Sequence, residues 1–184
     1  DIYTHDTWKV LAFLMPGAYI NKGTSLNLTI SSDGELEATL NSQRLAVNTN
    51  NLQDISLRFS NQEDCLTGDM TSAKASLGGF SFNDSHLKFL ADSNHFGLSY
   101  SYDNHSSAEN RGELVINGGL LRQDGELMAD ISLLPSSLLF NDRQWNIMPS
   151  SARVSGRNIR IDSLEVVSGD QRIYAYGGTS LSGR

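Results

Sequence analysis

The segment Leu26–Leu40 has the sequence LNLTISSDGELEATL, and it decides the fold class. Leu26, Leu28 and Ile30 alternate with polar residues, and the alternation resumes after the turn-forming residues Ser32-Asp33-Gly34. Side chains of an extended strand point alternately to opposite faces, so this period of two indicates strands that are covered on one face. Gly and Asp tolerate the backbone angles of tight turns. The segment therefore predicts two strands joined by a turn.

The same alternation recurs along the 184-residue chain, and Asn, Asp and Gly separate the alternating runs at intervals of roughly ten residues. Helical patterns are confined to the short candidates 7–15 and 135–140. The pattern predicts an all-β fold built from short strands and hairpins. The clearest further runs are Leu36-Ala38-Leu40, Ile55-Leu57-Phe59, Phe96-Leu98-Tyr100-Tyr102, Leu127-Ala129-Ile131-Leu133 and Ile159-Ile161.

Composition indicates one folded unit. The hydrophobic share is 39%, and the formal net charge of -7 comes from scattered residues without a basic cluster, so nucleic acid is not an expected partner. Cys65 is the single cysteine, which excludes an intrachain disulfide. The first residue is Asp1, and the motif Asp-Gly-Glu-Leu-x-Ala occurs at 33–38 and 124–129. We interpret residues 1–184 as a single strand-rich domain, a fragment of a larger repeat-containing protein.

Candidate catalytic groups are scattered. The four histidines lack metal-ligand spacing, and Glu35 with Glu37 matches a solvated strand face better than an acid-base pair. His95 near Asp92 could form part of a hydrolytic group, but the sequence has no Gly-x-Ser-x-Gly turn. We therefore expect a protein that is not an enzyme and that uses neither a metal nor a cofactor.

Several aromatic residues follow the strand alternation, which favours groove or core lining over a sugar-binding platform. A carbohydrate-binding or adhesive β-sandwich remains an alternative on this pattern. The aromatic residues concerned are Phe96, Tyr100, Tyr102, Trp145 and Tyr174.

About half of the chain resembles the repeat region of bacterial translocation and assembly module proteins, the TamB and AsmA-like family, in its Bacteroidetes branch. The resemblance covers an ordered pattern of short motifs rather than a catalytic signature. These motifs are Asn94–Asn104, Leu134–Ser137, Phe140–Asp142, Trp145–Ile147, Pro149-Ser150, Ile159–Ile161, Leu164–Val166, Gln171–Ile173 and Gly177.

The resemblance implies a long curled sheet, a taco-like half-pipe or elongated open barrel with an apolar inner face. It also implies a periplasmic segment of a parent protein that is anchored in the bacterial inner membrane. That parent would shield phospholipid acyl chains during transport between the inner and outer membranes. An outer-membrane β-barrel assembly protein would be its partner through other parts of the chain.

The strand alternation assigns a set of apolar residues to the inner face, where non-directional contact with acyl chains requires no reactive group. The alternative within the same family is a scaffold for outer-membrane β-barrel assembly or autotransporter secretion, which would offer strand edges to its clients. The residues predicted to line the lipid groove are Leu26, Leu28, Ile30, Ile55, Leu57, Phe59, Phe96, Leu98, Leu127, Ala129, Ile131, Ile159 and Ile161.

Overall fold

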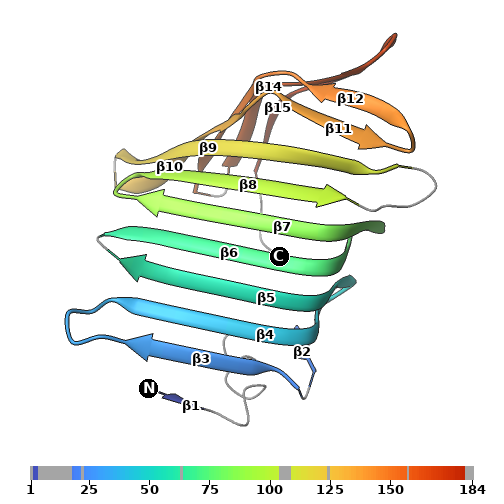
Figure 1. Cartoon of the computed structure of the whole chain (residues 1–184). Coiled ribbons are helices and arrows are strands. Elements are labelled where there is room, and N and C mark those ends of the chain that lie inside the picture. Colours follow the sequence, from blue (N-terminus) through green and yellow to red (C-terminus); the bar gives the residue numbers. More distant parts are fainter. Residues whose placement is uncertain are drawn as a thin grey trace.

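The structure is a computed structural model that describes residues 2–3, 18–21, 23–62, 64–103, 109–123, 125–156 and 158–180. The described strands form one antiparallel sheet and no helix, which confirms the predicted all-β class (Figure 1). The helical candidate 7–15 lies outside the described residues. The strands are β1 (Ile2–Tyr3), β2 (Ala18–Ile20), β3 (Ser25–Ile30), β4 (Leu36–Val47), β5 (Asn50–Gln62), β6 (Cys65–Leu77), β7 (Phe80–Asp92), β8 (His95–Asp103), β9 (Arg111–Gln123), β10 (Glu126–Leu133), β11 (Ser136–Phe140), β12 (Arg143–Ile147), β13 (Ser150–Ser155), β14 (Asn158–Ser168) and β15 (Gln171–Ser180).

From β3 onward the sheet is a meander in which successive strands pair with one another, although the strand order contains two apparent crossovers. At the N-terminal end, β1 pairs with β3 and β2 pairs with β4. Both β10 and β11 pair with β9, and the Leu134 amide donates to the Val115 carbonyl between them. In the same way β12 and β13 both pair with β14, and the Met148 amide donates to Glu165. β10 and β11 are therefore two parts of one long strand that is interrupted near Pro135. Likewise, β12 and β13 form one strand that is interrupted near Pro149. The helical expectation for 135–140 is wrong, because β11 continues the ladder there.

Two-residue turns join most of the long strands. Val47 pairs with Asn50 across Asn48-Thr49, and Leu77 pairs with Phe80 across Gly78-Gly79. Gly78 and Gly79 have φ values of 58° and 88°, a left-handed conformation that glycine adopts without steric penalty. Turns of this kind match the right-handed twist of the flanking strands and hold the register tightly.

The strands β4 to β7 all bend at the same cross-strand row, and the alternation of apolar and polar residues changes phase there. The last inner-face row before the bend is formed by Ser42, Ile55, Ser72 and Ser85. In each strand, the first inner-face residue after the bend lies three positions away instead of two. The ladder skips Asp54 at this point, and Asp54 has a φ of 49°. The row after the bend is Leu45, Leu52, Ala75 and Phe82.

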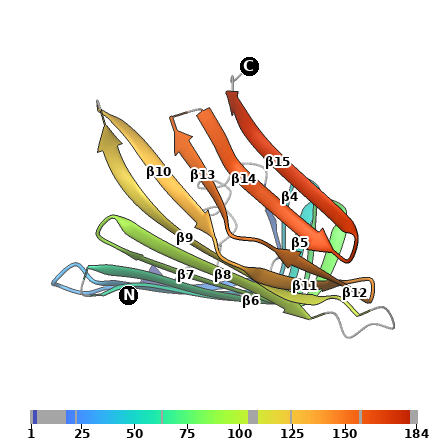
Figure 2. The ribbon, with the colours of Figure 1, turned by 90° about the horizontal axis from the view of Figure 1, so that it is seen from above.

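The bend gives the N-terminal half of the sheet an L shape with a long and a short arm. Seen from above, the short ends of β4 and β5 rise out of the layer of the neighbouring strands (Figure 2). The phase shift keeps apolar side chains on the inner side of both arms. Most of the buried side chains lie near this corner, including Leu40, Ile55, Ala75 and Tyr102.

Buried serines complete the backbone hydrogen bonding at the bend. Ser72 is 2% exposed, and its hydroxyl Oγ lies 2.8 Å from the Gln53 carbonyl oxygen and 2.9 Å from that of Lys74. The Ser42 hydroxyl donates to the Arg44 carbonyl oxygen at 3.1 Å and accepts a hydrogen bond from the Arg44 amide at 3.3 Å. A buried backbone group without a partner is destabilising, so these hydroxyls stabilise the bent conformation.

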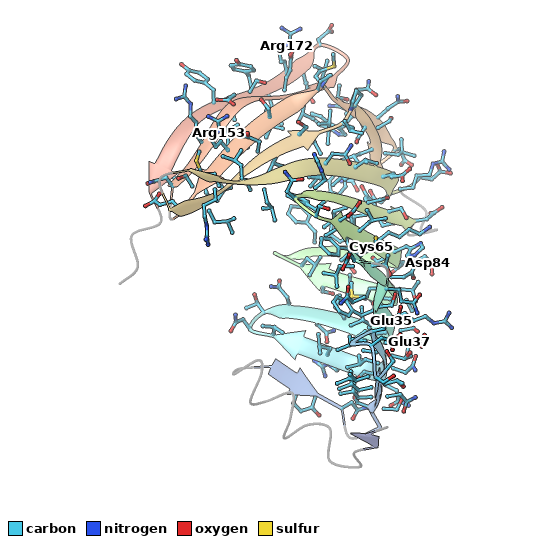
Figure 3. The ribbon with its side chains drawn as sticks, turned by 90° about the vertical axis from the view of Figure 1, so that its left-hand side faces the viewer. Glu35, Glu37, Cys65, Asp84, Arg153 and Arg172 are labelled. Carbon is cyan, nitrogen blue, oxygen red and sulfur yellow. The ribbon has the colours of Figure 1, made fainter. Side chains whose placement is uncertain are left out.

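The C-terminal strands curl over the inner side of the sheet. Figure 3 shows the orange and red strands arching over one side of the wall formed by the earlier strands. The same view places Glu37 and Arg172 on the convex side, which we call the outer face. The sheet is curved and is not closed into a regular barrel, so the expectation of a long curled sheet is confirmed. The described strands form one sheet rather than the two packed sheets of a β-sandwich.

We expect Ser72→Ala to lower the free energy of unfolding by about 1–3 kcal/mol, because the substitution removes the buried hydroxyl that bridges two strands at the bend. Urea unfolding followed by circular dichroism measures the change. Ser81→Ala, at an exposed position of β7, is the matched control and should stay within roughly 0.5 kcal/mol of the unmodified chain. Equal midpoints for the two variants would show that the bend does not depend on Ser72.

Candidate functional site

The cross-strand register brings all of the predicted groove residues to the inner face. Leu28 pairs with Ala38, which pairs with Phe59, and this row continues through Phe89 to Leu98. Residues that are directly opposite in neighbouring strands share a face of the sheet. The row therefore crosses six strands with its side chains on one side.

A second row joins the middle of the sheet to its C-terminal end. Phe96 pairs with Gly118, Gly118 with Ile131, Ile131 with Ala152, and Ala152 with Ile161. Because these rows run across the strands, the inner face is a continuous apolar strip rather than a set of separate clusters.

This apolar face is open along much of its length. Among the predicted groove residues, Ile55 is buried, whereas Ile30 and Leu127 are 59% and 58% exposed. The other predicted residues are half-buried. In the described part of the chain, the apolar side chains that are fully buried are Leu40, Ile55, Ala75, Tyr102 and Ile147.

The register adds inner-face residues that the sequence prediction did not include. Apart from Leu133, they lie on β4, β6, β7, β9 and β13, which contributed no residue to the predicted groove. Their signal in the sequence was the period of two, which glycine, serine or methionine interrupts in several of these strands. The added residues are Leu36, Ala38, Leu40, Leu66, Met70, Leu87, Phe89, Leu114, Ile116, Leu120, Leu133, Ala152 and Val154.

Glycines on the inner face lie beneath large side chains where the sheet curls. A Cβ atom on Gly118 would overlap the Phe96 ring, which shows that the ring covers Gly118. Leu138 covers Gly112 in the same way, with its Cα 3.2 Å from the position of a Cβ atom. Each glycine lets a bulky neighbour lie flat against the sheet. The Phe96 ring thereby forms part of the groove floor instead of filling the groove.

Aromatic rings fill the corner between the two arms. Phe82 of the short arm makes edge contacts with Tyr100 and Tyr102, with ring centroids 6.2 and 4.8 Å apart. The Tyr100 hydroxyl lies 3.0 Å from the Ser85 hydroxyl. Burial raises the pKa of both tyrosines above the ordinary value, so they are neutral at physiological pH. Their polar atoms are thus present in the corner without charge.

Two of the other aromatic residues differ in their placement. Trp145 pairs with Leu138 and shares the inner face, as expected. Tyr174 pairs with Glu165, whose carboxylate accepts a hydrogen bond from Arg172 at 3.0 Å. Tyr174 therefore lies on the outer face and is 56% exposed, so it does not line the groove.

The outer face carries most of the charged residues of the sheet and bears a shallow cavity of about 610 Å³. Its lining includes the charged residues Glu37, Arg58, Asp69 and Lys88 and the apolar residues Leu90 and Val115. His86 Nε2 lies 2.9 Å from Asp69 Oδ2. Opposite charges on neighbouring strands compensate one another here, and the cavity belongs to the face opposite the apolar strip.

The other candidate groups occupy separate positions. His95 pairs with Asp92 at the exposed turn between β7 and β8, while Glu35 and Glu37 lie on the convex side in Figure 3. Gly118 and Gly119 lie within β9, where they pair with Ile131 and Asp130. No group of three His, Cys, Asp or Glu side chains could hold a metal ion in the part of the chain that the structure describes.

No helix of the described ranges has the length and apolar character needed to cross a membrane. Comparison with protein families, with curated proteins and with solved structures found no match to this chain.

We expect Gly118→Ala to destabilise the fold by about 1–3 kcal/mol, because the added methyl group displaces the Phe96 ring from the groove floor. The matched control is Gly119→Ala, whose methyl group would meet its nearest atom, the Asn94 carbonyl oxygen, at 3.9 Å. Both substitutions reduce the entropy of the unfolded chain similarly, so this contribution cancels in the comparison. Urea unfolding compares the two variants, and equal stabilities would contradict the assigned Phe96 position.

Proposed function

We propose that this sheet shelters the acyl chains of phospholipids on its inner face, as a segment of a periplasmic conduit between the inner and outer membranes. The observation that carries the proposal is the continuity of the open apolar strip from β3 to β14. The parent protein would be anchored in the inner membrane, in agreement with the family resemblance of the sequence.

The free energy of burying the open apolar strip favours the binding of an apolar ligand. Burial of apolar surface contributes about 25 cal/mol per Å², and a contiguous apolar surface left in water is a characteristic of binding sites. An acyl chain is flexible and has no directional groups, so it can follow a strip of leucine, isoleucine and phenylalanine side chains. Polar headgroups would stay in water along the open side of the curl.

A second function is favoured by a separate observation, the edge of the sheet. β15 pairs with β14 along one side, and Ile173, Tyr174 and Tyr176 of this last described strand are 55%, 56% and 75% exposed. An exposed strand edge can add a strand from another chain through backbone hydrogen bonds. We propose this edge as the alternative site, at which the protein would assist the assembly of an outer-membrane β-barrel protein or the secretion of an autotransporter.

A photoreactive residue at Leu98 or Ile131 should form covalent adducts with phospholipid after the purified chain is incubated with phospholipid vesicles and illuminated. The neighbouring positions Ser99 and Ser132 lie on the outer face and serve as matched controls. Mass spectrometry of the intact chain detects the adducts. The acyl chains should contact the inner positions, because the continuous apolar strip lies on that face.

Adducts at equal yield on both faces, or no adducts at all, would contradict the conduit proposal. A photoreactive residue at Tyr176 tests the alternative, since the edge of β15 should then be crosslinked to an unfolded outer-membrane β-barrel protein supplied in the mixture. Protein adducts at Tyr176 together with the absence of lipid adducts at Leu98 would favour the assembly function.

A further inference from the structure

The strand β15 carries two exposed tyrosines on the outer face of the sheet. Tyr174 pairs with Glu165 of β14, and the alternation along β15 places Tyr176 on the same side. The two side chains are 56% and 75% exposed, and their ring centroids lie 5.6 Å apart with an angle of 42° between the ring planes. Tyrosine is enriched at binding surfaces, so an adjacent exposed pair indicates a contact surface for a ligand.

An ion pair lies beside Tyr174 on the same face. Arg172 precedes Tyr174 by two positions on β15, and its Nε lies 3.0 Å from Oε1 of Glu165 on the neighbouring strand. Figure 3 shows Arg172 on the convex side of the arch. A guanidinium group and a carboxylate have more donors and acceptors than one ion pair occupies, so this pair retains groups that can bind a ligand.

A second ion pair lies beyond Tyr176. Gly178 is the next outer position of β15, and it pairs with Arg160 of β14. Nε of Arg160 lies 3.2 Å from Oδ1 of Asp162, which belongs to the part of β14 that the ladder with β15 skips, opposite Tyr176. Gly178 has no side chain that could cover this pair. Hydrogen-bonding groups therefore border the two tyrosine rings on both sides along the strand.

The charges on this part of the outer face compensate one another. Arg153 pairs with Arg160 across the ladder, and its Nε lies 2.6 Å from Oδ1 of Asp130. Together with the two pairs beside the tyrosines, three arginines thus meet three carboxylates. These ion pairs leave no excess charge that would attract an anionic or a cationic ligand. The ligand that fits this surface is neutral, with an apolar face and many hydrogen-bonding groups.

We propose that Tyr174 and Tyr176 form a binding site for a neutral oligosaccharide. The site lies on the outer face and is independent of the lipid function proposed for the inner face. A pyranose ring has apolar C–H faces and a rim of hydroxyl groups. Its C–H groups would pack on the tyrosine rings, while its hydroxyl groups would donate to the neighbouring carboxylates and accept from the guanidinium groups.

The angle between the two rings favours one class of glycan. The ring planes are inclined by 42°, so a flat glycan ribbon cannot lie on both rings at once. Successive pyranose rings of the ligand must be inclined to one another, as they are in the coiled chain of an α-linked glucan. A β-linked glucan such as cellohexaose is an extended ribbon and would pack on one ring only. The site should therefore distinguish two sugars of the same composition by their shape.

The test titrates the purified chain with maltohexaose, the coiled α-linked glucan, and in parallel with cellohexaose. Shifts of the backbone amide signals in NMR spectra give the dissociation constant and the position of the bound sugar. We expect maltohexaose to shift the amide signals of β14 and β15 and to bind more tightly than cellohexaose. No shift with either sugar would overturn the site, and equal or tighter binding of cellohexaose would overturn the selection by ring angle.

Tyr174→Ala and Tyr176→Ala should each weaken maltohexaose binding about two- to tenfold, the range expected for the loss of one aromatic contact. Tyr176→Phe keeps the ring and should bind as the unmodified chain does. Tyr19→Ala removes a tyrosine of β2 that is 59% exposed, and it is the matched control with no expected change. Urea unfolding should show that all four variants are folded. Unchanged binding in both alanine variants of β15, or an equal loss in Tyr19→Ala, would overturn the role of the two rings.

Discussion

The structure depends on keeping a continuous strip of apolar side chains on one face while the sheet bends. With a strict period of two, one extra residue at the bend would place the apolar side chains of the two arms on opposite faces. The left-handed Asp54 and the three-residue interval between Ile55 and Leu52 restore the correct phase in β5. The same interval separates Ser72 from Ala75 in β6. Because neighbouring strands bend at the same row, the inner face remains apolar around the corner.

The sequence was sufficient to predict the all-β class and to place the predicted apolar residues on one face, since both follow from strand alternation. It identified only part of the inner face, because strands such as β6 and β9 contribute residues that the alternation alone did not single out. The bend was not foreseen, because an interval of three between Leu52 and Ile55 looks like the end of a strand when its neighbours are not compared. The row becomes visible only when the two-residue turns fix the register of adjacent strands. Pro135 was also misleading: it suggested a helical turn, whereas the ladder with β9 continues beyond it.

The placement of Tyr174 shows a further limit of reasoning from alternation. Near the irregular register between Ile161 and Leu164, the pairing of β14 with β15 changes phase, so the face of a residue there cannot be counted from distant strands. Similarly, the role of Gly118 could not be inferred from a glycine pair alone. Its partner Phe96 on β8 explains the absence of a side chain, because the aromatic ring occupies that space.

The open curl follows from how the inner face is filled. In a small closed barrel, side chains from all strands meet at the axis and fill the interior. Here the glycines beneath Phe96 and Leu138 let these side chains lie along the sheet, so curvature is achieved with less inward projection. The serines at the corner satisfy the bent backbone without adding apolar bulk. The small residues at these positions therefore produce both the curvature and the accessible apolar strip. A sheet built in this way can bend around a ligand without closing on itself.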